Sequence, residues 1–135
     1  MINSKIIKIA SDTKNSGLRN IYTHKSSIKN SLCGDKIKIE LIVDKAKIKS
    51  IRYETEACIL CEASACLVAK KFINYSLKNL LKDINKLKEK IKNKKTILPL
   101  KFTEFKYLLD KNALNRVNCV TLPFNALLKA FKYRL

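Results

Sequence analysis

The chain has 135 residues, 47% of them hydrophobic, and a formal net charge of +18. This length and composition predict one domain whose core needs no disulfides. No run approaches the ~18 apolar residues of a membrane span, and the first residues lack the apolar stretch of a secretion signal, so we expect a cytoplasmic protein without a membrane partner. Five cysteines in such a chain favour reduced thiols over a disulfide framework.

The positive charge alone would suggest nucleic acid as a partner, but its distribution disfavours that class. Lysine supplies most of the charge and is spread from Lys5 to Lys132, whereas arginine is rare and tryptophan is absent. Binding sites for nucleic acid more often combine clustered cations with aromatic side chains on which bases stack. We therefore expect a solvated lysine surface.

The first thirty residues predict a short helix followed by a loop. An apolar cluster from Ile2 to Ile9 favours the helix, and the polar run that ends at Asn30 favours the loop. The only histidine, His24, falls in this polar run. A lone histidine in a polar loop is more often solvated than a metal ligand.

Alternating residues then predict an antiparallel hairpin. Ile37, Ile39, Leu41 and Val43 alternate with Lys36, Lys38 and Glu40, which is typical of a half-buried strand. After a turn at residues 44–46, a second strand places Ile51, Tyr53 and Thr55 on one face; Ile48 is out of phase, which predicts a bulge near Lys49 and Ser50. Such a hairpin brings Cys33, Asp35 and Cys58 side by side.

The rest of the chain is expected to be helical. A helix should begin near Cys58 and reach about Ile73, with Cys61 and Cys66 in core or supporting positions. An amphipathic helix follows over residues 77–91, a basic linker over 93–98, and a short helix over 103–109. The last helix should begin between Cys119 and Leu122, with Pro123 in its first turn. Cys58 and Cys119 then both lie at helix N-termini, where the helix dipole favours a thiolate.

One possible ligand set follows from these placements: Cys33, Asp35, Cys58 and Cys119. Thiolates suit zinc or an iron–sulfur cluster, and a carboxylate is a harder, more exchangeable ligand. From the spacing alone, a metal site and a set of unrelated core cysteines are about equally well supported.

The residues around these positions resemble a known family. Cys33-Gly34-Asp35 ahead of a strand, Cys58 followed by Ala63-Ser64-Ala65, and Asn118-Cys119-Val120 ahead of a terminal helix are similar to the NifU N-terminal, IscU and SufU family of iron–sulfur cluster assembly scaffolds. The resemblance covers roughly residues 31–131. It implies an α+β fold over a single domain, residues 1–135, in which a small antiparallel sheet packs against several helices.

The resemblance also implies a function. Cys33, Cys58 and Cys119 would hold a transient [2Fe-2S] cluster, and Asp35 would be the carboxylate that promotes cluster release or ligates zinc. Such a protein is a scaffold or carrier without catalytic residues of its own. Its partners would be a cysteine desulfurase as sulfur donor and apo iron–sulfur proteins or a downstream carrier as recipients, with a homodimer around the cluster left open.

Three departures from the IscU pattern keep an alternative open. Asn118 stands where the IscU branch has a histidine, and residues 114–117 replace the segment that a dedicated chaperone recognises in that branch. The long interval between Cys58 and Cys119 is more like SufU, whose members bind zinc and relay sulfur. The alternative is thus a zinc-dependent sulfurtransferase, and a basic nucleic-acid-binding module ranks behind both.

Overall fold

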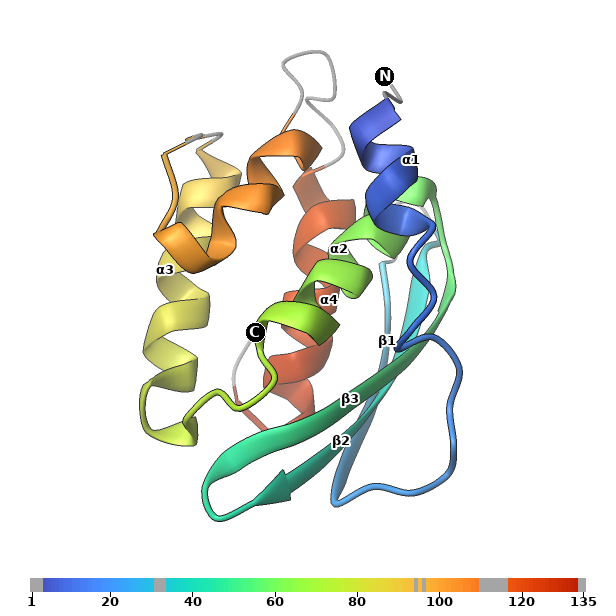
Figure 1. The fold of residues 1–135 in the computed structure, drawn as a ribbon, viewed down its shortest axis with the longest axis vertical. Coiled ribbons are helices and arrows are strands. Elements are labelled where there is room, and N and C mark those ends of the chain that lie inside the picture. The colour runs from blue at the N-terminus through green and yellow to red at the C-terminus, as the bar shows by residue number, and fades with distance from the viewer. Residues whose placement is uncertain (1–3, 31–33, 94, 96, 110–116, 134–135) are drawn as a thin grey trace.

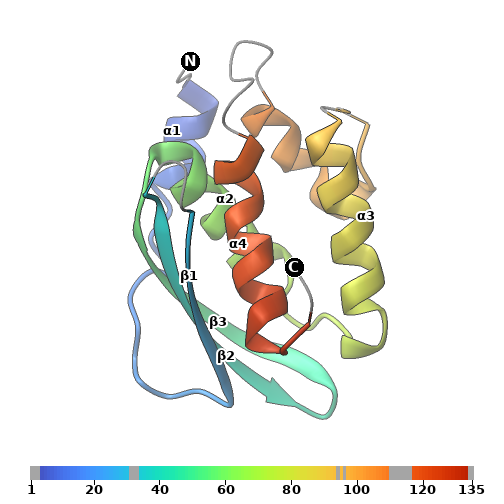
Figure 2. The same cartoon turned by 180° about the vertical axis from the view of Figure 1, so that it is seen from behind.

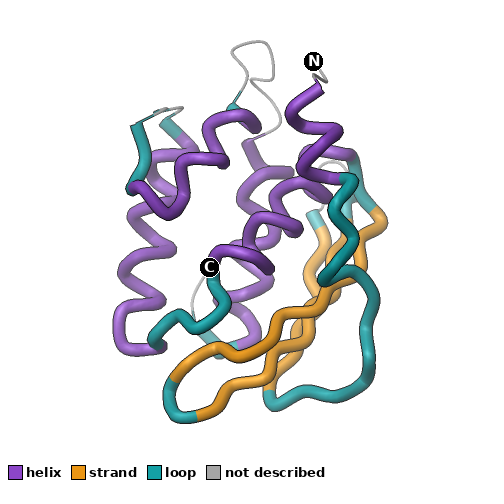
Figure 3. The backbone as a smooth tube through the Cα atoms, in the orientation of Figure 1, coloured by secondary structure: helices purple, strands orange, loops and turns teal. Residues whose placement is uncertain are grey.

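The computed structural model describes residues 4–30, 34–93, 95, 97–109 and 117–133 (Figure 1). It is an α+β fold, as predicted, in which one antiparallel sheet with strand order β1-β2-β3 packs against helices (Figures 1 and 3). The elements in chain order are α1 (Ser4–Ala10), β1 (His24–Lys29), β2 (Lys36–Asp44), β3 (Lys47–Glu56), α2 (Ile59–Lys71), the 3-10 helix η1 (Leu77–Asn79), α3 (Leu80–Lys92), the 3-10 helix η2 (Leu100–Leu108) and α4 (Val117–Ala130).

Helices α2 and α4 lie side by side on one face of the sheet, and α3 packs against α4 on the side away from the strands (Figures 1 and 2). Helix α2 is buried on nearly every side because α1, α4, η2 and β3 all contact it. Its small residues between Ala63 and Ala69 allow this close approach. No helix in the described part of the chain is long and apolar enough to cross a membrane.

The predicted hairpin is confirmed, including its bulge. Strands β2 and β3 pair from Lys36 opposite Glu56 to Asp44 opposite Lys47. The register shifts where Ile42 faces Ser50 but Val43 faces Ile48, so that Lys49 has no partner in the ladder. This extra residue returns Ile48 to the buried face, which explains its phase in the sequence.

The expected loop before residue 30 is wrong in part, because His24–Lys29 forms the edge strand β1. Its alternate residues are only half-buried, and two of the three are polar, so apolar alternation did not reveal it. His24 faces Leu41 in the register and packs on Phe131, with ring centroids 4.8 Å apart. It therefore lies at the other end of β2 from Asp35.

Three helical predictions can be compared with the structure. The amphipathic helix over residues 77–91 is confirmed as η1 followed by α3, with its lysines outward except for Lys88, which is buried. The short helix over 103–109 is the 3-10 helix η2, which begins at Leu100. Pro123 is not in a first turn, because α4 already includes Val117 and the proline lies inside the helix.

The segment after α1 runs along the free edge of β3, and we call residues 14–20 the strap. Gly17 N–H donates to the Tyr53 carbonyl at 2.7 Å, and the Arg52 guanidinium donates to three strap carbonyls, those of Lys14, Ser16 and Gly17. Glu40, expected on a solvated face, is buried because its Oε1 accepts the N–H groups of Arg19 and Asn20.

Candidate metal centre

Three of the four predicted ligands meet at one end of the sheet. The possible ligand atoms of Asp35, Cys58 and Cys119 all lie within 4.8 Å of one another. They come from the residue before β2, the N-cap of α2 and the first described turn of α4. Cys33, the fourth predicted ligand, lies outside the described residues.

Local backbone structure positions Asp35. The Asn30 N–H donates to the Asp35 carbonyl at 2.7 Å, and the Gly34 N–H donates to the Asn30 carbonyl at 2.8 Å, which closes the connection between β1 and β2. Gly34 has a φ of +76°, a conformation that other residues adopt at a cost. These bonds fix where the Asp35 side chain leaves the chain, directly ahead of β2.

The Asp35 carboxylate is buried against Cys58. Its Oδ1 accepts the backbone N–H of Cys58 at 3.2 Å, and its Oδ2 lies 3.5 Å from the Cys58 Sγ, which donates to it. Cys58 itself is extended, and its side chain makes no capping bond to the start of α2. Its sulfur is therefore directed to the centre instead of to its own helix.

Cys119 is buried, and its environment favours the protonated thiol in the metal-free protein. Burial is the main cause that raises the Cys119 pKa, followed by hydrogen bonds and negative charge from Asp35 and Cys58. A soft cation reverses this preference, since metal ligation replaces the thiol proton and neutralises the neighbouring carboxylate. The three groups repel one another when all are charged, and a bound cation would remove that repulsion.

Cys61, Cys66 and His24 do not join this group. Within the described ranges, Asp35, Cys58 and Cys119 are the one set of three His, Cys, Asp or Glu side chains close enough to hold a metal ion. Cys61 is fully buried, and Cys66 is buried with its Sγ donating to the Asp12 carbonyl at 3.3 Å. Both therefore occupy the core positions that the helical spacing predicts.

Sequence reasoning missed the support that Ser64 gives to α4. The hydroxyl of this fully buried residue of α2 donates to the Val120 carbonyl at 2.6 Å. The available signal was a polar residue in a run of small apolar ones, since a buried hydroxyl needs a partner.

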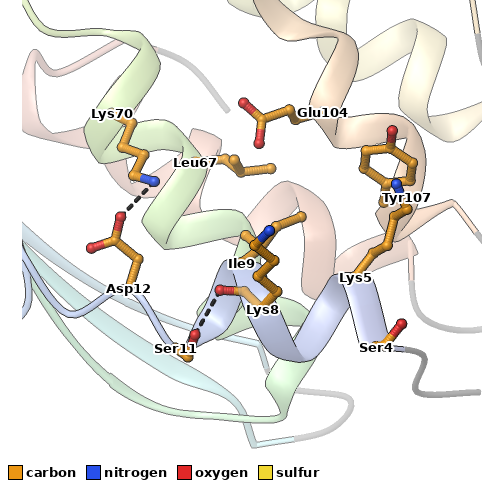
Figure 4. Close-up of a pocket in the computed structure, with 10 residues that line it drawn as sticks. All are labelled: Ser4, Lys5, Lys8, Ile9, Ser11, Asp12, Leu67, Lys70, Glu104 and Tyr107. Carbon is orange, nitrogen blue, oxygen red and sulfur yellow. Dashed lines mark hydrogen bonds and ion pairs between the residues drawn. The ribbon is translucent and has the colours of Figure 1, made fainter.

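A hollow lies away from the candidate metal centre, between α1, α2 and η2 (Figure 4). It has a volume of about 660 Å³, with Leu67 among the residues that line it and lysines around it. Lys70 pairs with Asp12 at 2.5 Å, and the Lys5 ammonium sits 4.4 Å from the centre of the Tyr107 ring. None of the three clustered candidate ligand residues lines this hollow, so the candidate metal centre and the hollow are separate features.

Known proteins share this architecture. The structure of the N-terminal part of a nitrogen-fixing NifU-like protein from Brucella abortus matches with a TM-score of 0.83 and 19% identity, over 96% of this chain and 91% of that one. An iron–sulfur cluster assembly scaffold protein for the SUF system from Fervidobacterium islandicum AW-1 also matches with a TM-score of 0.83, at 24% identity, over 97% of this chain and 96% of that one.

Sequence comparison points the same way. The iron–sulfur cluster assembly scaffold protein IscU of Thermotoga maritima is 27% identical over 133 residues, which is 98% of this chain and 93% of the relative. The model of the NifU-like N terminal domain matches residues 1–114, which include Asp35 and Cys58 and end before Cys119. The chain therefore belongs to the family of NifU-like N-terminal domains.

Proposed function

We propose that this protein is an iron–sulfur cluster assembly scaffold that builds a labile [2Fe-2S] cluster on Cys33, Cys58 and Cys119, with Asp35 beside it, and passes it to apo-proteins. The observation that carries the proposal is the convergence of Asp35, Cys58 and Cys119 within 4.8 Å. Family membership and the scaffold role in the name of the Thermotoga maritima relative support it.

The chemistry of the donor set suits a cargo that is held and then released. Thiolates are soft ligands for iron and sulfur clusters, whereas a carboxylate oxygen is a harder and more exchangeable ligand. Cys33 stands two residues before Asp35 in the sequence and would complete the three thiols. A desulfurase would deliver sulfur as a persulfide, whose outer sulfur a thiolate attacks while the donor sulfur leaves as a thiolate. An external reductant would then supply two electrons to convert each transferred sulfur atom to the sulfide of the cluster.

The position of the centre also suits transfer to a partner. Cys58 is only half-buried, Gly34 is exposed, and a Cβ built on Gly34 would meet nothing within 4 Å. A cluster at this end would therefore lie near the surface, where a recipient thiol can reach it. Iron and sulfide are cargo in this proposal, so the protein turns over no substrate by itself.

A zinc-dependent sulfurtransferase is the second candidate, and the compactness of the group favours it. A zinc ion bound by thiolates at ~2.3 Å needs ligand atoms about 4 Å apart, and the three described ligand atoms lie within 4.8 Å of one another. Cys33 would close a tetrahedral set. In that case one thiolate would have to leave the metal before it could accept sulfur.

The metal content of the anaerobically purified protein separates the two candidates. For a transfer scaffold we expect iron and acid-labile sulfide in equal amounts after reconstitution, and slower cluster loss in Asp35→Ala, because the exchangeable carboxylate is gone. Asp44→Ala is the matched control, because it removes an exposed carboxylate at the far end of β2, and it should behave as wild type.

One tightly held zinc per chain, no reconstituted cluster and stimulation of a cysteine desulfurase would instead support the sulfur relay. A protein that takes up neither zinc nor a cluster would refute both candidates.

A further inference from the structure

Ser64 lies on the helix that carries one ligand and bonds to the helix that carries another. It belongs to α2, whose N-cap is Cys58, and its hydroxyl donates at 2.6 Å to the carbonyl of Val120, the residue after Cys119. Ser64 is fully buried, so losing this bond would leave a polar group in the core without compensation. The bond therefore holds two ligand-bearing helices at a fixed separation.

A proline limits the backbone hydrogen bonding of the first turns of α4. Pro123 lies inside the helix and has no N–H, so it cannot donate to the Cys119 carbonyl four residues earlier. The backbone bonding around Cys119 therefore differs from that of a regular helix at this one carbonyl. The hydroxyl of Ser64 reaches the neighbouring carbonyl from α2 and fixes this part of α4 from outside.

We infer that Ser64 is a positioning residue that sets the separation of the Cys58 and Cys119 sulfurs for the cargo. The inference rests on the proposed function, since it assumes that both thiols bind the same metal or cluster. Ser64 does not contact the cargo, because it lies six positions beyond Cys58 on α2, about 9 Å along the helix axis. It acts through the backbone of α4.

Ser26 offers a matched control, because it lies on β1 and also bonds to a carbonyl of α4. Its hydroxyl donates to the Ala126 carbonyl, also at 2.6 Å, from β1 to the later part of α4. Each Ser→Ala change therefore removes one hydroxyl bond of equal length from α4. Only the bond of Ser64 lies beside a ligand residue, so a purely structural role predicts the same outcome at both positions.

The test measures Co²⁺ and Zn²⁺ binding to the full chain carrying Ser64→Ala or Ser26→Ala. Thiolate-to-cobalt absorption reports on ligand geometry, chelator competition gives the zinc affinity, and urea unfolding gives the stability. Loss of a group that orients metal ligands costs about 10- to 100-fold in affinity. We expect that loss and an altered cobalt spectrum for Ser64→Ala, and affinity within about twofold of wild type for Ser26→Ala. Equal affinities in the two variants would overturn the inference.

A second measurement needs no metal. In a background of Cys33→Ser, Cys61→Ala and Cys66→Ala, dibromobimane can fluoresce only by bridging Cys58 and Cys119. We expect slower bridging when Ser64→Ala is added and an unchanged rate with Ser26→Ala. An unchanged rate in both would refute the positioning role. If the wild-type protein bound no metal but Ser64→Ala still slowed bridging, the proposed function would be refuted and the positioning of the two sulfurs by Ser64 would stand.

Discussion

Helix α2 presents two kinds of cysteine, and the contrast between them shows what makes a thiol available. Cys58 is at its N-cap, half-buried, with its sulfur beside a carboxylate from another element. Cys61 and Cys66 lie one and two turns further along and are buried in the core. Distance from the helix start, and not residue type, separates the candidate ligand from cysteines that act as small hydrophobic side chains.

Removing a candidate ligand thiol should give the largest effect on metal binding. We expect Cys58→Ser or Cys119→Ser to weaken zinc or cobalt binding by more than about 100-fold, since each removes a thiolate ligand. Cys61→Ala and Cys66→Ala should keep wild-type affinity. Competition with a chromophoric chelator measures all four variants, and loss of binding in Cys61→Ala would contradict the division between ligand and core thiols.

Stability should show the reverse order. Cys61→Ala and Cys66→Ala each leave a small void in a packed core, and we expect a loss of about 1–2 kcal/mol in the free energy of unfolding. Cys58→Ala removes a half-buried sulfur and should cost less than either. Urea unfolding of the metal-free proteins makes this comparison, and a greater loss for Cys58→Ala would mean that its thiol supports the fold.

The smallest expected effect is a shift in pH dependence. Burial raises the pKa of Cys66, so its thiol should react with iodoacetamide only at a higher pH than in urea-unfolded chain, whose thiols titrate near ~8.5. Because the folded pKa is the higher one, the stability linked to Cys66 is fully present below the unfolded pKa and is lost as pH rises through the folded value. A variant with Cys66 as its sole cysteine isolates the titration, and equal midpoints in folded and unfolded protein would contradict the burial argument.

Local patterns predicted what local interactions determine. The β2–β3 hairpin and its bulge follow from alternation within a short span, and the hairpin brings Asp35 to Cys58 by pairing alone. Cys119 comes from the far end of the chain. Its expected place at a helix N-terminus made it a candidate ligand, and the family resemblance decided in favour of that set before the structure brought Cys119 to Asp35 and Cys58.

Three features escaped sequence reasoning because distant contacts determine them. Strand β1 has little apolar alternation, and it is held by pairing with β2 and by the Ser26 bond to α4. Pro123 is typical of a first turn, but a packed helix tolerates it in the interior at the loss of one hydrogen bond. The tie between Ser64 and Val120 likewise depends on how two helices pack.

The strap has a consequence for how two copies of this protein can meet. An edge strand is a template for pairing with another chain, and β3 is an edge of this sheet. The strap occupies the backbone groups of Tyr53, while Asn74 and Tyr75 bond to Ile48 further along the same edge. On the opposite edge, the Lys129 ammonium binds the Ser27 carbonyl. Groups of the same chain thus occupy backbone hydrogen-bonding positions at both edges of the sheet. Strand pairing between two copies would first have to break these intramolecular bonds.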